Sequence, residues 1–358
     1  MNAATAQVRD VLLVRLSAMG DIVHALGAMQ ALARARPTWR LHVAVQREFA
    51  PLFAQLDWVA SIIEHDRRAG LLGFARLIRR LRALRCDLAL DLQGNWKSAL
   101  AVRASGAPRR IGIASTWRRE PGSARLLNER VAASASVPHP ARLALDVVRA
   151  VAPEAVLTPS RLVATEAEVE HEAAALRALG VDPGLPFLLL VLGDPADNRS
   201  WSATSAAGAA RACAWPAVVV AGPREPVGMP LPPGIPLLRH ARGELRRLIA
   251  LGVLLARVEG RAIGPDQGAT HVLAACGADV TVLFGPQDPA RSASLGARVA
   301  VHPSPPACMP CRRRTCDHAE GPLCMRFEPD QVMPPTSLRP SILSRRSGTT
   351  SSSSDAAG

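Results

Sequence analysis

The sequence predicts an α/β protein with two doubly wound parallel sheets in tandem, each forming the core of one domain. Short apolar runs of strand length alternate with segments of helical spacing, and this alternation stops near residue 160 and restarts near residue 186. The length of 358 residues corresponds to roughly two domains. With 48% hydrophobic and 20% charged residues, the chain has enough apolar side chains for two cores, which excludes wholesale disorder.

In the first half, short and mainly apolar runs predict strands, and the run at residues 11–15, rich in β-branched residues, predicts a buried parallel strand. These runs are residues 11–15, 41–45, 59–64, 88–91 and 110–113. Apolar residues at intervals of three and four predict the intervening helices. The expected helices are residues 22–35, 49–56, 71–85, 97–104 and 138–151. This alternation predicts an N-terminal domain over residues 1–160.

The second half repeats the pattern after a linker that we place at residues 161–185. Its domain spans residues 186–332, with expected strands at 187–192, 217–221, 262–263 and 279–284. Helices are expected at residues 166–179, where Gly180 supplies a C-cap, and at 245–257 and 270–276. Residues 202–214 have weaker helical character, and the Pro-, Ser- and Thr-rich residues 333–358 are predicted to be disordered.

The net charge of +13 predicts a surface that attracts anions such as phosphates or an acidic membrane. Aromatic residues make up only 3% of the chain, which argues against binding single-stranded nucleic acid by base stacking. We therefore expect no nucleic-acid partner. A nucleic-acid-binding protein stays a weaker alternative, which a steep salt dependence of duplex affinity would favour.

The sequence also predicts a cytoplasmic location. No apolar run approaches the roughly 18 residues of a membrane-spanning helix. Charged residues interrupt the apolar stretch near the N-terminus, which is not typical of a secretory signal. The expected helix at residues 71–85 surrounds an apolar face with arginines, so it either packs with a solvated basic face or docks on an anionic membrane surface.

Cys308, Cys311, Cys316 and Cys324 form a cluster near the end of the second domain. In a cytoplasmic chain such a cluster is more often a metal site or a set of reduced thiols than a disulfide framework. Four thiolates suit a structural zinc ion, although the spacing is not that of a paired zinc knuckle. Structural zinc, reduced thiols and a disulfide therefore remain alternatives.

Several loops that follow predicted strands carry unusual residues, and in parallel sheets such loops surround the ligand. Asp21, beside Gly20, is either a helix N-cap or a general base for a sugar hydroxyl. Lys97, the only lysine of the chain, opens a helix. Arg199 follows the first strand of the second domain, where a cation can hold a phosphate. An ordinary solvent-exposed position is the alternative for Lys97 and Arg199.

Another such loop, residues 264–268, joins a strand to a helix. Free N–H groups at a helix start bind a diphosphate, and Gly268 leaves room for its approach. His271 lies in the first turn of this helix, either in the site or facing solvent. The chain contains no GxGxxG motif at this point, so a nicotinamide-binding fingerprint is not indicated.

Six segments occur in an order that resembles a known family. They are RLSAMGDIVHAL at 15–26, DLQGNWKSA at 91–99, RREP at 118–121, RSW at 199–201, GPDQGATHVLAA at 264–275 and FGPQDP at 284–289. Over about residues 8–332 the chain resembles glycosyltransferase family 9, the ADP-heptose:lipopolysaccharide heptosyltransferases. The resemblance implies a glycosyltransferase-B fold with the active site between two Rossmann-like domains. It also implies inverting heptose transfer from ADP-heptose to a lipid A–Kdo or heptosyl acceptor, without a catalytic metal or cofactor.

The resemblance also implies roles for individual residues. Asp21 would be the catalytic base, and Arg199 would hold the donor phosphates. The donor would be bound by Gly20, Glu225, Asp266, Gln267, Gly268 and His271. The acceptor would be bound by Lys97, Arg118 and Arg119. Because that acceptor is a membrane lipid, the resemblance implies peripheral association with the cytoplasmic face of the inner membrane.

The chain departs from the family pattern at Gly27 and Ser202, where the family has proline, and at Arg199, where it has lysine. Arginine keeps the charge of lysine, but its planar fork is not interchangeable with an ammonium group. The alternative function is therefore a catalytically weakened homologue that binds nucleotide or sugar without efficient transfer.

Overall fold

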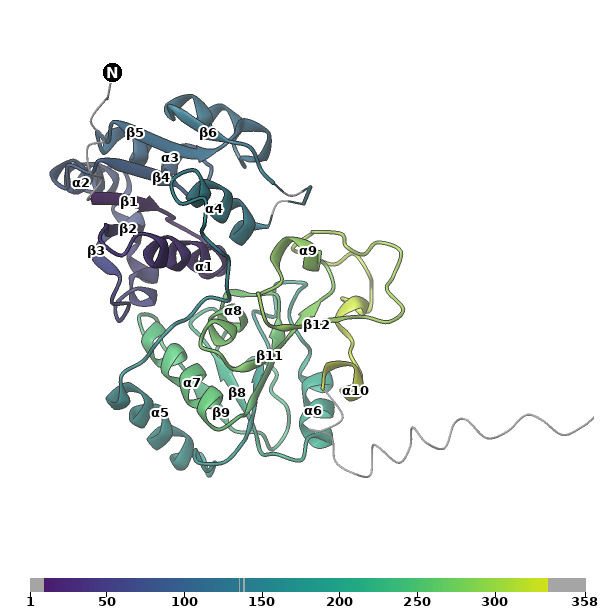
Figure 1. The fold of residues 1–358 in the computed structure, drawn as a ribbon. Helices are drawn as coiled ribbons and strands as arrows, with labels where there is room; N and C mark the ends of the chain where they lie inside the picture. The colour runs from purple at the N-terminus through teal and green to yellow at the C-terminus, as the bar shows by residue number, and fades with distance from the viewer. Residues whose placement is uncertain (1–9, 135, 138, 334–358) are drawn as a thin grey trace, which may run out of the picture.

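The computed structural model describes residues 10–134, 136–137 and 139–333. Except for Met333, the tail that is expected to be disordered lies outside these residues, as does Pro138, the first residue of an expected helix. The described chain forms two α/β halves, each built on a six-stranded sheet in which neighbouring strands are parallel (Figure 1). The predicted class, two doubly wound sheets in tandem, is confirmed.

The first sheet has the strand order β3-β2-β1-β4-β5-β6. Its strands are β1 (Asp10–Val14), β2 (Arg40–Gln46), β3 (Val59–His65), β4 (Leu88–Asp91), β5 (Arg109–Ile113) and β6 (Glu129–Val131). Its α-helices are α1 (Met19–Ala35), α2 (Gly70–Ala83), α3 (Trp96–Ala104) and α4 (Pro140–Arg149). Short 3-10 helices are η1 (Arg47–Leu52), η2 (Arg67–Ala69), η3 (Ser115–Trp117) and η4 (Pro121–Leu126).

Strand β1 is buried on both faces, as its unbroken apolar run predicts. Val11 and Leu13 belong to the core that contains α1 and α4, whereas Leu12 and Val14 belong to the core that contains α2 and α3. Helices therefore cover both faces of the sheet, and the loops at the carboxyl ends of its strands stay accessible to a ligand.

The second sheet has the order β12-β11-β10-β7-β8-β9. Its strands are β7 (Leu188–Val191), β8 (Ala217–Ala221), β9 (Leu237–Arg239), β10 (Arg261–Pro265), β11 (Asp279–Phe284) and β12 (Arg298–Val301). Its helices are α5 (Glu166–Ala178), α6 (Ala203–Ala212), α7 (Leu245–Arg257), α8 (Gly268–Ala275), α9 (Pro289–Ser292), η5 (Leu323–Met325) and α10 (Pro329–Val332). Counted within its own half, this order equals that of the first sheet, so the order reverses beside β1 in one half and beside β7 in the other.

Three strands and one helix differ from the sequence prediction. The edge strands β6, β9 and β12 have three or four residues each and contain arginines, so they lack the apolar run that marks the inner strands. The weakly predicted helix near residues 202–214 does form, as α6. Ser202 Oγ caps it by accepting from Ser205 N at 3.1 Å, and its buried alanines pack in the second-half core.

The linker between the halves is shorter than the predicted residues 161–185, because α5 packs on α7 within the second half. Glu172 of α5 is fully buried, pairs with Arg247 and lies 3.0 Å from His240 Nε2. Glu168 pairs with Arg246 at 2.6 Å. The chain between the two halves therefore consists of the residues between α4 and α5.

The apolar face predicted for residues 71–85 is only partly correct. Gly73, Leu77 and Leu81 are the buried residues of α2, and they recur every four residues on one stripe. Leu71 is 90% exposed and Leu72 is 69% exposed, because the helical rotation places them away from that stripe. The start of α2 therefore presents two leucines to solvent.

The two halves meet where α1 packs on α8. The connecting segment passes close to α1 at Gly27, where a Cβ atom would lie 2.6 Å from the carbonyl oxygen of Thr158. Gln30 Nε2 donates to Arg161 O at 2.7 Å, and its Oε1 accepts from Arg161 N at 3.0 Å. None of the helices in the described part of the chain is both long and apolar enough to cross a bilayer.

Candidate active site

A cleft between the two halves is lined by loops that follow the carboxyl ends of strands, where doubly wound sheets bind ligands. Its lining residues are Asp21, Pro140, Arg199, Asp266, Gln287, Arg291, Ser292, Arg312 and Arg314. The structure thus brings together three residues that the sequence singled out from different loops, namely Asp21, Arg199 and Asp266.

Asp21 lies in the first turn of α1 and opens to the cleft, with 46% of its side chain exposed. The helix begins at Met19, and its N-cap residue Ala18 makes no side-chain capping bond, so the interpretation of Asp21 as the N-cap is wrong. Arg15 Nη2 lies 3.0 Å from Asp21 Oδ2. Arg15 is itself buried and donates to Leu92 O, so it anchors the carboxylate by one oxygen. An anchored and accessible carboxylate is suited to accepting a proton.

The start of α8 lies against the start of α1. A Cβ atom on Gly268 would lie 2.5 Å from Met19, and one on Gly20 would lie 2.9 Å from the ring of His271, so both glycines allow the close approach. The N-cap residue of α8, Gln267, makes no side-chain capping bond. Its Nε2 is buried and has no hydrogen-bond partner among the described residues. The start of α8 therefore offers N–H donors that suit a phosphate group.

Asp266 and His271 hold each other at the cleft wall. His271 Nε2 lies 3.0 Å from Asp266 Oδ1, and His271 Nδ1 lies 2.7 Å from Ser294 Oγ. Ser292 Oγ donates to Asp266 Oδ2 at 3.1 Å. His271 is buried, so the interpretation that it faces solvent is wrong. The network fixes the Asp266 carboxylate beside the ligand space.

A second histidine contact joins the two halves three residues after Asp21. The ring of His24 lies 4.5 Å from that of His271 and 5.2 Å from that of His139, measured between centroids. Burial, together with the positive charge of His271, His139 and Arg15, lowers the pKa of His24 to about 2. His24 is therefore neutral at physiological pH and packs as an uncharged ring at the contact between the two halves.

Arg199 reaches the cleft, but most of its fork is engaged. Its Nε and Nη2 donate to the two carboxylate oxygens of Asp197 at 2.9 and 2.6 Å, and its Nη1 donates to Asp266 O at 2.9 Å. The bond to Asp197 raises the pKa of Arg199. Arg199 therefore braces the β7 loop against the β10 loop, and it is half-buried rather than a freely solvated arginine.

Glu225, Lys97 and Arg119 lie away from this cleft lining. Glu225 follows β8, and its Oε2 accepts from Gly222 N at 2.9 Å. An acidic residue after the second strand of a Rossmann unit is in the position that contacts a ribose. Lys97, in the first turn of α3, and Arg119 are both exposed. They remain accessible to an acceptor, although neither lines the cleft that holds Asp21.

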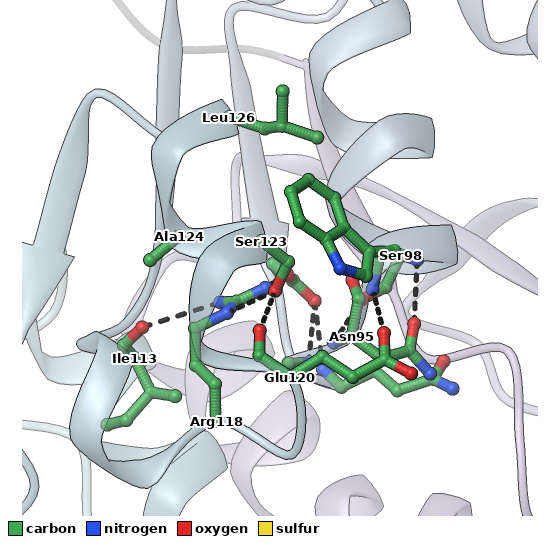
Figure 2. A network of polar contacts seen from close by, with 12 residues as sticks. Asn95, Ser98, Ile113, Arg118, Glu120, Ser123, Ala124 and Leu126 are labelled. Carbon is green, nitrogen blue, oxygen red and sulfur yellow. Dashed lines mark hydrogen bonds and ion pairs between the residues drawn. The ribbon is translucent and has the colours of Figure 1, made fainter.

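Arg118 is buried in a polar network of the first half and does not face the acceptor side (Figure 2). Its Nη2 pairs with Asp91 Oδ2, and both side chains are completely buried. Its Nε donates to Ser123 Oγ at 2.8 Å, and its Nη1 donates to Ile113 O at 3.4 Å. The expected acceptor contact is therefore corrected to a structural role, because every nitrogen that would reach a ligand is enclosed.

Comparison with known proteins shows which family the chain is similar to. The family model described as glycosyltransferase family 9 (heptosyltransferase) matches residues 74–203. Lipopolysaccharide heptosyltransferase 1 of Pseudomonas aeruginosa is 28% identical, and the alignment covers 90% of this chain and 95% of that protein. Over most of its length the chain is therefore similar to heptosyltransferases of glycosyltransferase family 9.

Solved structures of similar proteins show the same fold. The glycosyl transferase family 9 protein of Veillonella parvula has a TM-score of 0.74 at 15% identity, covering 92% of this chain and 97% of its own. E. coli heptosyltransferase WaaC with ADP-2-deoxy-2-fluoro heptose has a TM-score of 0.62 at 18% identity, covering 82% and 93%. The glycosyltransferase-B fold, with two Rossmann-like halves, is therefore confirmed.

The sequence leaves structural zinc, reduced thiols and a disulfide as alternatives for the cysteine cluster. All four cysteines are free thiols, with Cys324 buried and Cys308 exposed. Cys308 Sγ lies 3.5 Å from His318 Nε2, and Asn198 Nδ2 lies 3.9 Å from Cys311 Sγ. In the described part of the chain no three His, Cys, Asp or Glu side chains are grouped so that they could hold a metal ion.

Sequence reasoning gave no role to several residues of the cleft. Gln287 lies within the FGPQDP segment after β11, and Arg291 and Ser292 follow that segment. Arg312 and Arg314 belong to the run of three arginines inside the cysteine cluster. That run was the available signal, but in a chain with 43 basic residues it does not stand out.

Proposed function

We propose that the protein transfers a heptose from ADP-heptose to the lipopolysaccharide inner core, with a lipid A–Kdo or heptosyl acceptor and inversion at the anomeric carbon. The observation that carries the proposal is the Asp21 carboxylate in one cleft with four arginines, beside the start of α8. The name of the P. aeruginosa relative supports the acceptor class, and the ligand of the E. coli structure supports the donor class.

In the proposed reaction the acceptor hydroxyl attacks the anomeric carbon of the heptose while Asp21 accepts the hydroxyl proton. The new C–O bond forms as the bond from that carbon to the diphosphate oxygen breaks, and ADP leaves with the electron pair. Attack opposite the leaving group inverts the anomeric configuration. Proton transfer to Asp21 is effective because the hydroxyl becomes more acidic as its oxygen bonds to carbon.

The chain's own donors meet the charge that develops on the leaving diphosphate. These are the N–H groups at the start of α8, the unpartnered Nε2 of Gln267 and the arginines of the cleft. Donors that are already in place stabilise such charge without reorganisation. This supports a reaction that needs no divalent cation, with ADP-heptose as a substrate and no bound cofactor.

The test is a mass-spectrometric transfer assay with the purified protein, ADP-heptose and a panel of truncated lipid A–core acceptors, with and without EDTA. We expect one heptose to be added to one acceptor, with no effect of EDTA. ADP binding without transfer to any acceptor would favour the catalytically weakened homologue. Loss of transfer in EDTA that magnesium restores would contradict the metal-independent part of the proposal.

We also propose that the protein works at the cytoplasmic face of the inner membrane, bound peripherally through a basic patch. The patch consists of Arg67, Arg68, Arg76, Arg79 and Arg80 around Leu71 and Leu72. All seven side chains are exposed, and none of these arginines forms an ion pair with a described residue. Arginines near an anionic bilayer contribute about 1 kcal/mol each, and exposed leucines can enter the headgroup region.

A further inference from the structure

Besides Arg199, three arginines line the cleft. Arg291 lies in α9, and Arg312 and Arg314 lie in the cysteine segment, which we define as residues 308–324. All three line the cleft that contains Asp21. Among the residues that the structure describes, no carboxylate forms an ion pair with any of the three. They are partly or fully exposed, so their guanidinium groups are available to a ligand.

Most other charged groups of the cleft are held by the protein. Asp21 pairs with Arg15, Arg199 pairs bidentately with Asp197, and Asp266 is held by His271 and Ser292. Burial works to raise the pKa of Asp197, but the bonds and charge of Arg199 and the charge of Arg314 hold it below its ordinary value. Because the single carboxylate of Asp197 is taken by Arg199, the cleft keeps a surplus of positive charge.

The backbone presents alternate arginines of the cysteine segment to the cleft. Arg312 N donates to Pro286 O at 2.7 Å, and Asn198 N donates to Arg314 O at 2.9 Å, so the segment is bound to the loops after β11 and β7. Arg312 has φ +57°, a left-handed conformation that is uncommon for a residue with a side chain. Arg313, between them, does not line the cleft and pairs instead with Asp317.

We propose that Arg291, Arg312 and Arg314 form a binding site for a phosphate or carboxylate group of a substrate. Guanidinium groups bind such oxyanions through paired, charge-assisted hydrogen bonds. Two sources fit this chemistry: the diphosphate of the nucleotide-sugar donor and the acidic groups of the acceptor. Naming these sources rests on the proposed function, whereas the oxyanion site itself rests on the unpaired arginines.

The test compares the double variant Arg312→Gln, Arg314→Gln with the control Arg313→Gln, which removes an arginine of the same segment that points elsewhere. Thermal melting checks that both variants fold. Calorimetric titration measures the Kd for inorganic pyrophosphate and for ADP, and the transfer assay measures KM for ADP-heptose and for the acceptor. We expect the double variant to weaken at least one of these about tenfold or more, the range for lost charge-assisted bonds, while Arg313→Gln changes none.

The arms separate the two sources. A weaker Kd for pyrophosphate and ADP assigns the site to the donor diphosphate. A raised acceptor KM with unchanged ADP binding assigns it to the acceptor. If the double variant matches Arg313→Gln in every titration and in both KM values, the oxyanion site is wrong. If the wild-type protein transfers no heptose, the proposed function fails, and the pyrophosphate titration still tests the site.

Discussion

The two sheets share one strand order, but the loops at their carboxyl ends treat charge in different ways. In the first half, Arg118 is completely buried against Asp91, and Arg15 is buried against Asp21. In the second half, the described cleft residues include Arg312 and Arg314, which pair with no carboxylate. Both halves use arginine to fix a carboxylate, as Arg199 does with Asp197 in the second half, but the second half also keeps Arg312 and Arg314 open to the cleft.

The difference shows that two sheets with the same strand order can differ in the charges that their loops present at the carboxyl ends of the strands. The buried Arg118–Asp91 pair has no capacity left for a ligand. Arg15 holds the Asp21 carboxylate by one oxygen and leaves it accessible from the cleft. Unpartnered donors near a cleft are costly unless a ligand satisfies them. In the second half the buried Gln267 Nε2 carries that cost, whereas the open arginines are solvated and available to an anionic ligand.

The largest expected effect comes from Asp21→Asn. The amide keeps the shape of the side chain but cannot accept the acceptor proton, so transfer should fall about 100- to 10,000-fold. The Kd for ADP should stay nearly unchanged, because the proposed donor site lies in the second half. Mass spectrometry measures the transfer rate, and calorimetric titration measures the Kd for ADP. Turnover close to that of the wild type would show that Asp21 is not the base.

The next effect concerns the stability of the first half, where Arg118 and Asp91 form a buried ion pair. Arg118→Ala leaves the Asp91 carboxylate buried without a cation, which should lower the free energy of unfolding by about 3–5 kcal/mol. Arg119→Ala is the matched control: its side chain is exposed, so the change should be within about 0.5 kcal/mol. Urea denaturation measures both. Equal stability of the two variants would break the contrast between the buried arginine and its exposed neighbour.

A smaller effect is expected at the membrane. The double variant Arg79→Glu, Arg80→Glu should weaken binding to vesicles with anionic lipid by about 2 kcal/mol or more, roughly 30-fold, at low salt. The control Arg211→Glu, Arg242→Glu reverses two exposed arginines of the second half and gives the same net charge. Co-sedimentation at low and high salt distinguishes them. Equal losses in both variants would mean that net charge, and not the basic patch, drives the association.

The inner strands and the cleft loops could be predicted from the sequence because each depends on a local pattern. An apolar run such as that of β1 predicts a strand in any context, and loops after parallel strands must meet at one edge. That reasoning placed Asp21, Arg199 and Asp266 together before any contact was known. The edge strand β9 could not be predicted, because three residues are too few to show a periodic pattern of apolar side chains.

The direction of individual arginine side chains could not be predicted in the same way. Arg118 and Arg312 are both charged residues of loops, and composition gives them equal claims on a ligand. Their difference arises from tertiary contacts: Asp91, on a neighbouring strand, encloses Arg118, and a bond to Pro286 O turns Arg312 toward the cleft. Contacts between residues far apart in the sequence therefore decide which arginine is free to bind a ligand.

The smallest expected effect is a pH dependence of stability that arises where His24 packs against His271 and His139, at the contact between the two halves. The ordinary pKa of 6.5 applies to His24 in the unfolded chain, whereas burial and the charges of His271, His139 and Arg15 lower it to about 2 in the native chain. Between these values the unfolded chain binds a proton that the native chain excludes. The free energy of unfolding is therefore highest above pH 6.5 and falls as pH drops below it, by about 1.4 kcal/mol per pH unit for one group.

Urea denaturation between pH 7.5 and 5 measures this slope above the range in which carboxylates titrate. In the variant His24→Leu, residue 24 has no proton to bind, so the slope should become shallower by that amount. Some slope should remain, because burial also lowers the pKa of His139 at the same contact. An unchanged slope in His24→Leu would mean that this contact opens to water before the protein unfolds. The two halves would then be less firmly joined than the packing of α1 on α8 indicates.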